Sequence, residues 1–185
     1  QSDNDESVKG GSSGYRRDRR NQEPIFEGLP DTVPPQNLEA EEAVLGGILL
    51  DPDAIGRVAD ILQPEAFYLN AHREMFRTAL MLHGQGKPTD LTSMTAWLAD
   101  TGSLEKVGGN GRLIELVERV SSTASIEQVA RLVMDKFLRR QLIRSGNEVI
   151  KLGFDQSLPM EQVLDQAEQT IFAISQEKPS KGLTP

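Results

Sequence analysis

Residues Ile126 to Leu152 read IEQVARLVMDKFLRRQLIRSGNEVIKL, and apolar side chains recur along most of this stretch every three or four residues. The spacing predicts one α-helix of about seven turns at ~3.6 residues per turn, with an apolar face. Such a helix is too long for a compact helical head. Its apolar positions are Ile126, Val129, Ala130, Val133, Phe137, Leu138, Leu142, Val149 and Leu152.

A second amphipathic helix is predicted after a short turn at residues 153–159, where Ser157 is a candidate N-cap. Its apolar positions are Met160, Val163, Leu164, Ala167, Ile171 and Ile174. Two amphipathic helices joined by a short connection predict an antiparallel hairpin. We therefore expect residues 123–176 to form a helical hairpin.

The two predicted arms differ in charge. The first arm has more Arg and Lys than Asp and Glu, whereas the second has Glu161, Asp165 and Glu168 with no cation before Lys178. Exposed ion pairs add only ~0.2–1 kcal/mol each, so these charges influence orientation and partner choice more than stability. Two helices cannot hide both apolar stripes from water, so the hairpin is expected to pack against another subunit or a partner protein.

The residues expected at that contact lie on both arms. The polar candidates are Arg131, Asp135, Arg139, Arg140 and Arg144, and the apolar candidates are Leu138, Leu142, Leu164 and Ile171. Packing between the two arms of one chain would bury the same apolar residues, and the arginines would also suit a solvated face. Both alternatives stay open at this point.

Residues 37–122 are predicted to form an all-α head of about six helices, because alternation typical of strands never persists there. Asn37, Asn70 and Asp90 are candidate N-caps, and Gly84 suits a helix C-terminus. His72 and Trp97 stand at helical spacing among apolar neighbours, so they are interpreted as packing residues. Residues 1–36 are poor in apolar side chains and are predicted to be a disordered tail. Its basic YRRDRR run is interpreted as a solvated charge run, and contact with nucleic acid or an acidic partner is the alternative.

Several kinds of chemistry have no support in the sequence. The stretch HGQGKPTD at His83 to Asp90 is not a phosphate-binding loop, because Met81 stands where the first glycine is needed and Pro88 where a hydroxyl is needed. The chain has no cysteine and two histidines, and no catalytic or metal-binding group can be nominated. Its net charge of −8 argues against broad attraction to nucleic acid. No apolar run is long enough to span a membrane, and a reducing cytoplasm is the expected location.

Four runs, taken together and in order, carry a resemblance to a known family. They are NLEAEEAVLGGIL from Asn37, FYLNAHREMF from Phe67, GKPTDLTSMTAWL from Gly86 and IEQVARLVMDKFLRRQLI from Ile126. From Pro34 to about Ser175 the chain resembles the N-terminal domain of bacterial-type replicative DNA helicases of the DnaB family.

The resemblance implies a six-helix head, a helical hairpin, and pairing of hairpins with hairpins in a collar built as a trimer of dimers. It also implies docking of the C-terminal domain of primase and, in some lineages, of a helicase loader. In that family ATP, Mg²⁺ and DNA unwinding belong to a separate motor domain, to which residues 177–185 would begin the linker. The alternatives are the helicase-binding domain of a primase, which has a similar head and hairpin, and a helical nucleic-acid-binding module.

Overall fold

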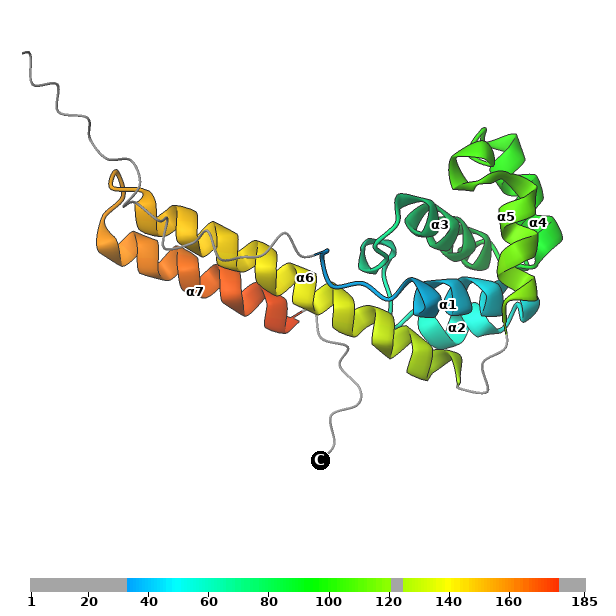
Figure 1. Cartoon of the computed structure of the whole chain (residues 1–185), viewed down its shortest axis with the longest axis horizontal. Helices are drawn as coiled ribbons and strands as arrows, with labels where there is room; N and C mark the ends of the chain where they lie inside the picture. Colours follow the sequence, from blue (N-terminus) through cyan, green and yellow to red (C-terminus); the bar gives the residue numbers. More distant parts are fainter. Residues whose placement is uncertain (1–32, 121–124, 177–185) are drawn as a thin grey trace, which may run out of the picture. The chain divides into compact units, whose positions relative to one another are not determined.

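The computed structural model describes residues 33–120 and 125–176, which belong to one unit of the chain beginning at Val33. These residues contain helices and no strand, which confirms the all-α prediction. The helices are α1 (Leu38–Leu50), α2 (Ala54–Val58), α3 (Asn70–Gly84), α4 (Leu91–Asp100), α5 (Gly109–Glu118), α6 (Ile126–Phe154) and α7 (Met160–Gln176), with 3₁₀ turns η2 (Pro64–Ala66) and η3 (Glu105–Val107) (Figure 1).

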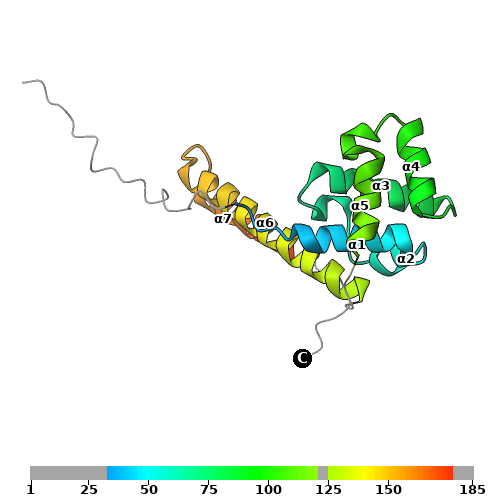
Figure 2. The ribbon, with the colours of Figure 1, turned by 45° about the vertical axis from the view of Figure 1, so that its right-hand side comes forward.

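The head differs slightly from the predicted six helices. Its described part has five α-helices, α1 to α5, and two 3₁₀ turns, while the N-terminal part of α6 packs against α1 and supplies the remaining helical layer (Figures 1 and 2). The predicted tail and linker lie largely outside the described residues, as does the predicted boundary between head and hairpin at residues 122–123. The domain limits therefore stay predictions.

Side-chain caps explain where several helices begin. The carboxamide of Asn37 accepts a hydrogen bond from the amide of Ala40 at 3.0 Å, and the carboxylate of Asp90 accepts one from the amide of Ser93 at 2.8 Å. Each side chain satisfies a backbone N–H that has no partner within its helix. Both caps were predicted from the sequence.

Two predicted caps are wrong. Asn70 is the first residue of α3 rather than its cap, and its side chain accepts from Arg73 instead. Ser157 lies too far from the start of α7, since the chain enters this helix through Pro159, whose carbonyl accepts from the amide of Val163. The hydroxyl of Ser157 donates to the carboxylate of Asp155 within the turn.

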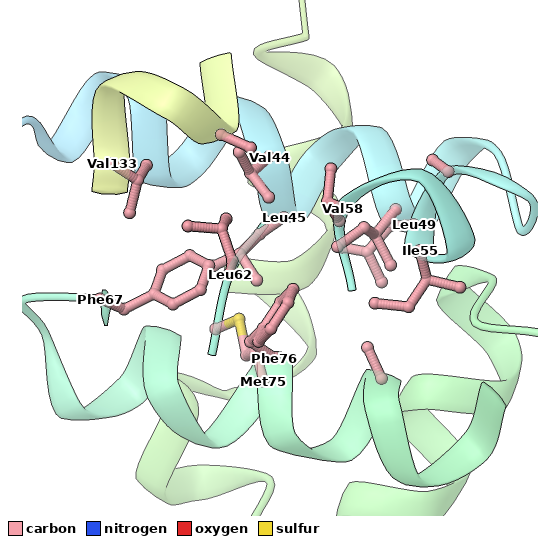
Figure 3. Packing of buried hydrophobic residues seen from close by; sticks show 14 of the residues in the cluster. Val44, Leu45, Leu49, Ile55, Val58, Leu62, Phe67, Met75, Phe76 and Val133 are labelled. Atoms are coloured by element: carbon pink, nitrogen blue, oxygen red, sulfur yellow. The ribbon is translucent and has the colours of Figure 1, made fainter. Parts of the chain in front are cut away.

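The core of the head forms where α1, α2, α3 and α6 meet (Figure 3). Residues from all four helices and from η2 are buried there, and the rings of Phe67 and Phe76 lie 4.9 Å apart. Full burial of one such side chain is worth about 1.5–3 kcal/mol. The core therefore holds the first half of α6 firmly against the head.

Helix α5 packs closely against α1. Gly46 faces the backbone of Leu116 with no room for a larger side chain. Beside this contact, the carboxylate of Glu42 accepts from Arg112 at 2.5 Å and from Arg119 at 3.0 Å. Burial alone would raise the pKa of Glu42, but the two arginines outweigh it and lower that pKa below 4.5.

Candidate interaction surface

Helix α6 changes its surroundings halfway along. Its buried residues are Val129, Ala130, Val133, Met134 and Phe137, and none of the residues after Phe137 is buried. From there on its neighbour is α7, which runs antiparallel beside it (Figures 1 and 2). Helix α7 has no other contacting helix or 3₁₀ turn among the described elements. The predicted hairpin is therefore present, and its distal part is covered on one side only.

One stripe of α7 forms the seam with α6. Val163 is buried, and Ala167, Thr170 and Ile174 are half-buried, at spacings of four, three and four residues. This repeat keeps one narrow face directed at a neighbouring helix. On α7, packing between the arms therefore uses a different set of apolar residues from the candidates Leu164 and Ile171.

A second apolar stripe of α7 stays open to solvent. Leu164, Ile171 and Phe172 are 57%, 44% and 62% exposed, and Leu142 on α6 is 55% exposed. Leu138, in contrast, is half-buried and packs against the core of the head. Three of the four apolar candidates, Leu142, Leu164 and Ile171, thus lie at the surface, and the fourth belongs partly to the head.

A shallow groove of about 770 Å³ runs between the two arms on this side. Gly146 and Val149 of α6 form one wall, and the exposed Ile171 and Phe172 of α7 form the other. Because Gly146 has no side chain, the groove is open over the middle of the hairpin. Phe172, which the sequence did not single out, is among the most exposed apolar side chains at this site. The sequence could have indicated it, because Phe172 is an aromatic residue on an otherwise polar side of the helix, directly after Ile171.

The polar candidates do not form one cluster. Asp135 and Arg139 form an ion pair within α6, with 2.9 Å between Oδ2 and Nε, and Arg131 and Arg144 are exposed on the same helix. Arg140 points into the chain itself and donates to the backbone carbonyls of the head. The structure thus separates Arg140 from the other predicted surface residues.

The sequence also missed a buried polar contact in the head. The carboxylate of Glu41 accepts from the amide of Tyr68 at 2.6 Å, and its second oxygen lies 2.7 Å from Nδ1 of His72. Both side chains are almost inaccessible to solvent. The signal was their position, because Glu41 and His72 each stand three and four residues before buried apolar residues of the same helix.

The described part of the chain contains neither a cluster of side chains suited to a metal ion nor a helix that could span a membrane. No group of three or more His, Cys, Asp or Glu side chains there could hold a metal ion. None of the described helices has the length and apolar character needed to cross a membrane. The features left to explain are the exposed stripe, the groove and the charges of the hairpin.

Comparisons with known proteins agree with this architecture. The replicative DNA helicase DnaB of Nostoc sp. PCC 7120 is 56% identical over 151 residues, which cover 82% of this chain and 17% of the relative. The corresponding helicase of Synechocystis sp. PCC 6803 is 48% identical, with 83% of this chain and 18% of the relative covered. The chain thus spans less than a fifth of the length of these relatives.

Solved structures show the same fold. The crystal structure of the N-terminal domain of DnaB helicase from Mycobacterium tuberculosis matches with a TM-score of 0.71 and 36% identity, covering 77% of this chain and 99% of that one. A DnaB-like replicative helicase studied with its interactions with primase matches with a TM-score of 0.64 and 30% identity, over 75% of this chain and 31% of that one. The family model of the DnaB-like helicase N-terminal domain matches residues 33–135. By sequence and by fold, this chain belongs to the family of DnaB-like helicase N-terminal domains.

Proposed function

We propose that this domain is the oligomerisation and partner-docking part of a replicative DNA helicase, and that its hairpin is the working surface. The observation that carries the proposal is the second apolar stripe of α7, which remains exposed although α6 already covers the first. Exposed apolar side chains grouped in this way are typical of protein–protein contacts. In the assembled collar, pairs of hairpins would build a trimer of dimers.

A second copy of the same hairpin fits the surface by charge. Helix α6 has six basic and three acidic residues, whereas α7 has three acidic residues and no basic one. In a two-fold dimer both copies use the same patch. Helix α7 of each copy can therefore face α6 of the other copy. Such pairing places opposite charges together and buries Leu164 and Ile171 between the hairpins.

The C-terminal domain of primase is the proposed partner of the assembled collar. The matched helicase structure, which concerns interactions with primase, supports this proposal, as does the family resemblance. A helicase loader is a further proposed partner in lineages that use one. The family assignment favours the helicase over the alternative of a primase domain.

The remaining activities of a helicase are assigned elsewhere. ATP, Mg²⁺ and DNA unwinding would belong to a motor domain, and no described residue is given a role in them. We propose that the complete protein works in the cytoplasm, where replication of bacterial DNA takes place. Direct nucleic-acid binding by this domain is the competing function, and it predicts an affinity that falls steeply with salt.

The test is the solution mass of the chain as a function of concentration, with and without the C-terminal domain of a primase. We expect reversible association of the chain alone and an additional complex with primase. Leu164→Ser should weaken self-association by about tenfold, because roughly 1.4 kcal/mol of apolar burial would be lost. Gln162→Ser, an exposed polar change on the same helix, is the matched control.

A strictly monomeric chain that ignores primase would refute the proposal. If the Leu164→Ser and Gln162→Ser variants associated equally well, the assignment of the α7 stripe as the contact surface would be wrong. A salt titration with single-stranded and duplex DNA separates the competing function, since strong salt-dependent binding without self-association would favour a nucleic-acid-binding module.

A further inference from the structure

Arg140 is held by the head in an unusual way for a residue of the hairpin helix. Its guanidinium donates to the carbonyl of Pro35 at 2.7 Å and to the carbonyl of Ala66 at 2.6 Å. The same group lies over the rings of Tyr68 and Phe137, at 5.6 and 5.9 Å from the ring centroids. One side chain of α6 thus joins the segment before α1 to the segment before α3.

The segment that receives Arg140 is itself fixed on both sides. Arg73 donates to the carbonyl of Phe67 at 2.6 Å, and Glu41 accepts from the amide of Tyr68 at 2.6 Å. Residues 67–69 lie outside regular secondary structure, and these two side chains satisfy backbone groups that have no partner in a helix. Arg140 therefore binds next to a backbone segment, residues 67 and 68, that other side chains of the head already hold in place.

The chemistry of the contact requires a guanidinium. Its planar array of N–H donors reaches two carbonyls at once and stacks on aromatic rings, which the single ammonium of lysine does not reproduce. Neither of these two hydrogen bonds of Arg140 goes to a carboxylate. Burial lowers the pKa of Arg140 below its ordinary value, because the guanidinium has lost part of its hydration.

Arg140 also occupies a special place along α6. The last buried residue of the helix is Phe137, and residues 141–154 lie beyond the contact of Arg140 with the head. At about 1.5 Å per residue these 14 residues form a lever of roughly 21 Å, so a tilt of about 10° at Arg140 moves its end by roughly 4 Å. A small change at this point would displace the whole distal surface of the hairpin.

We propose that Arg140 is a positioning residue, which sets the direction in which the hairpin leaves the head by clamping α6 to the carbonyls of Pro35 and Ala66. The apolar contacts up to Leu138 hold α6 on the head, and the clamp fixes its angle two residues further along the helix. Arg140 thereby acts on the geometry of assembly through the direction of the hairpin.

Distances between two spin labels test this directly, because the chain contains no cysteine and two can be introduced freely. Asp100→Cys in the head and Gln156→Cys in the hairpin turn are exposed positions. Labelled chain diluted into an excess of unlabelled chain reports the distance within one molecule, whether or not copies associate. The parent chain should give one narrow distribution, and Arg140→Gln should broaden it or shift its mean by about 4 Å.

Two further variants make the outcome specific. Arg140→Lys should restore the distribution only in part, and Lys151→Gln, which removes a cation from the distal part of α6, should leave it unchanged. If Arg140→Gln loses its helical circular dichroism, it has unfolded, and the distance distribution of Arg140→Lys then tests the proposal. A folded Arg140 variant with the parent distribution, or an equal shift in the Lys151 control, would overturn the proposal.

Discussion

Replacing Gly46 with alanine adds one methyl group at the closest contact between α1 and α5. The new Cβ would lie 2.5 Å from Cγ2 of Val120 and closer still to the carbonyl oxygen of Leu116. Carbon atoms normally approach to about 3.5–4.0 Å, so the two helices would have to move apart by about 1 Å. A side chain could rotate away, but the carbonyl of Leu116 belongs to a helix and cannot.

Two effects of opposite sign set the magnitude. Overpacking of this kind costs about 1–3 kcal/mol, and the backbone contact places Gly46→Ala near the upper end. Alanine in place of glycine inside a helix stabilises the folded state by about 0.5–1 kcal/mol. The net destabilisation is therefore about 2 kcal/mol, which lowers Tm by roughly 6 °C for a domain of this size.

Thermal unfolding followed by circular dichroism measures the effect. The matched control is Gly111→Ala, because Gly111 also lies in a helix but has nothing within 4 Å of an added Cβ. The control should gain about 0.5 kcal/mol, so the two identical substitutions should change stability in opposite directions. If Gly46→Ala were as stable as Gly111→Ala, the close packing of α1 on α5 would be refuted.

Three further predictions concern polar groups of the head. Glu41→Leu should cost about 2–4 kcal/mol, because it leaves the Tyr68 amide and a ring nitrogen of His72 buried without an acceptor, whereas Glu41→Gln should cost clearly less; urea unfolding compares them, and equal midpoints would contradict the contact. Asn37→Ala should cost about 1 kcal/mol in the same assay through loss of the α1 cap, and an unchanged midpoint would show that the cap contributes nothing. The lowered pKa of Glu42 means that its ion pairs stabilise the fold fully above pH 4.5 and less as the pH falls through the folded-state pKa. Stability measured from pH 6 to pH 3 should therefore fall less steeply in Glu42→Gln, and an identical profile would argue against the assigned role.

The elements of this protein could be predicted because their causes are local. The spacing of apolar residues over Ile126 to Leu152 indicated a long helix, and α6 spans Ile126–Phe154. Asn37 and Asp90 cap their helices as expected, since a cap needs only the amide three residues ahead. The exposed stripe with Leu164 and Ile171 followed from the same periodicity.

Contacts between distant segments could not be predicted in this way. The sequence did not single out Glu41 as a buried residue, and the fold buries it against His72, 31 residues away. Arg140 was a candidate for a subunit contact or a solvated face, and the structure shows that it reaches the carbonyl of Pro35, 105 residues away. Helical periodicity tells which side of a helix a residue occupies, but not which segment will lie opposite it.

The sequence by itself determined an all-α chain with a hairpin and a surplus apolar surface, because helix formation and amphipathicity depend on residues within a few turns of one another. Tertiary structure alone decided which arginine of α6 holds the head, which glycine lets two helices approach, and which carboxylate is buried. These choices depend on where the backbone groups of other segments lie, and the chain places those groups only when it packs.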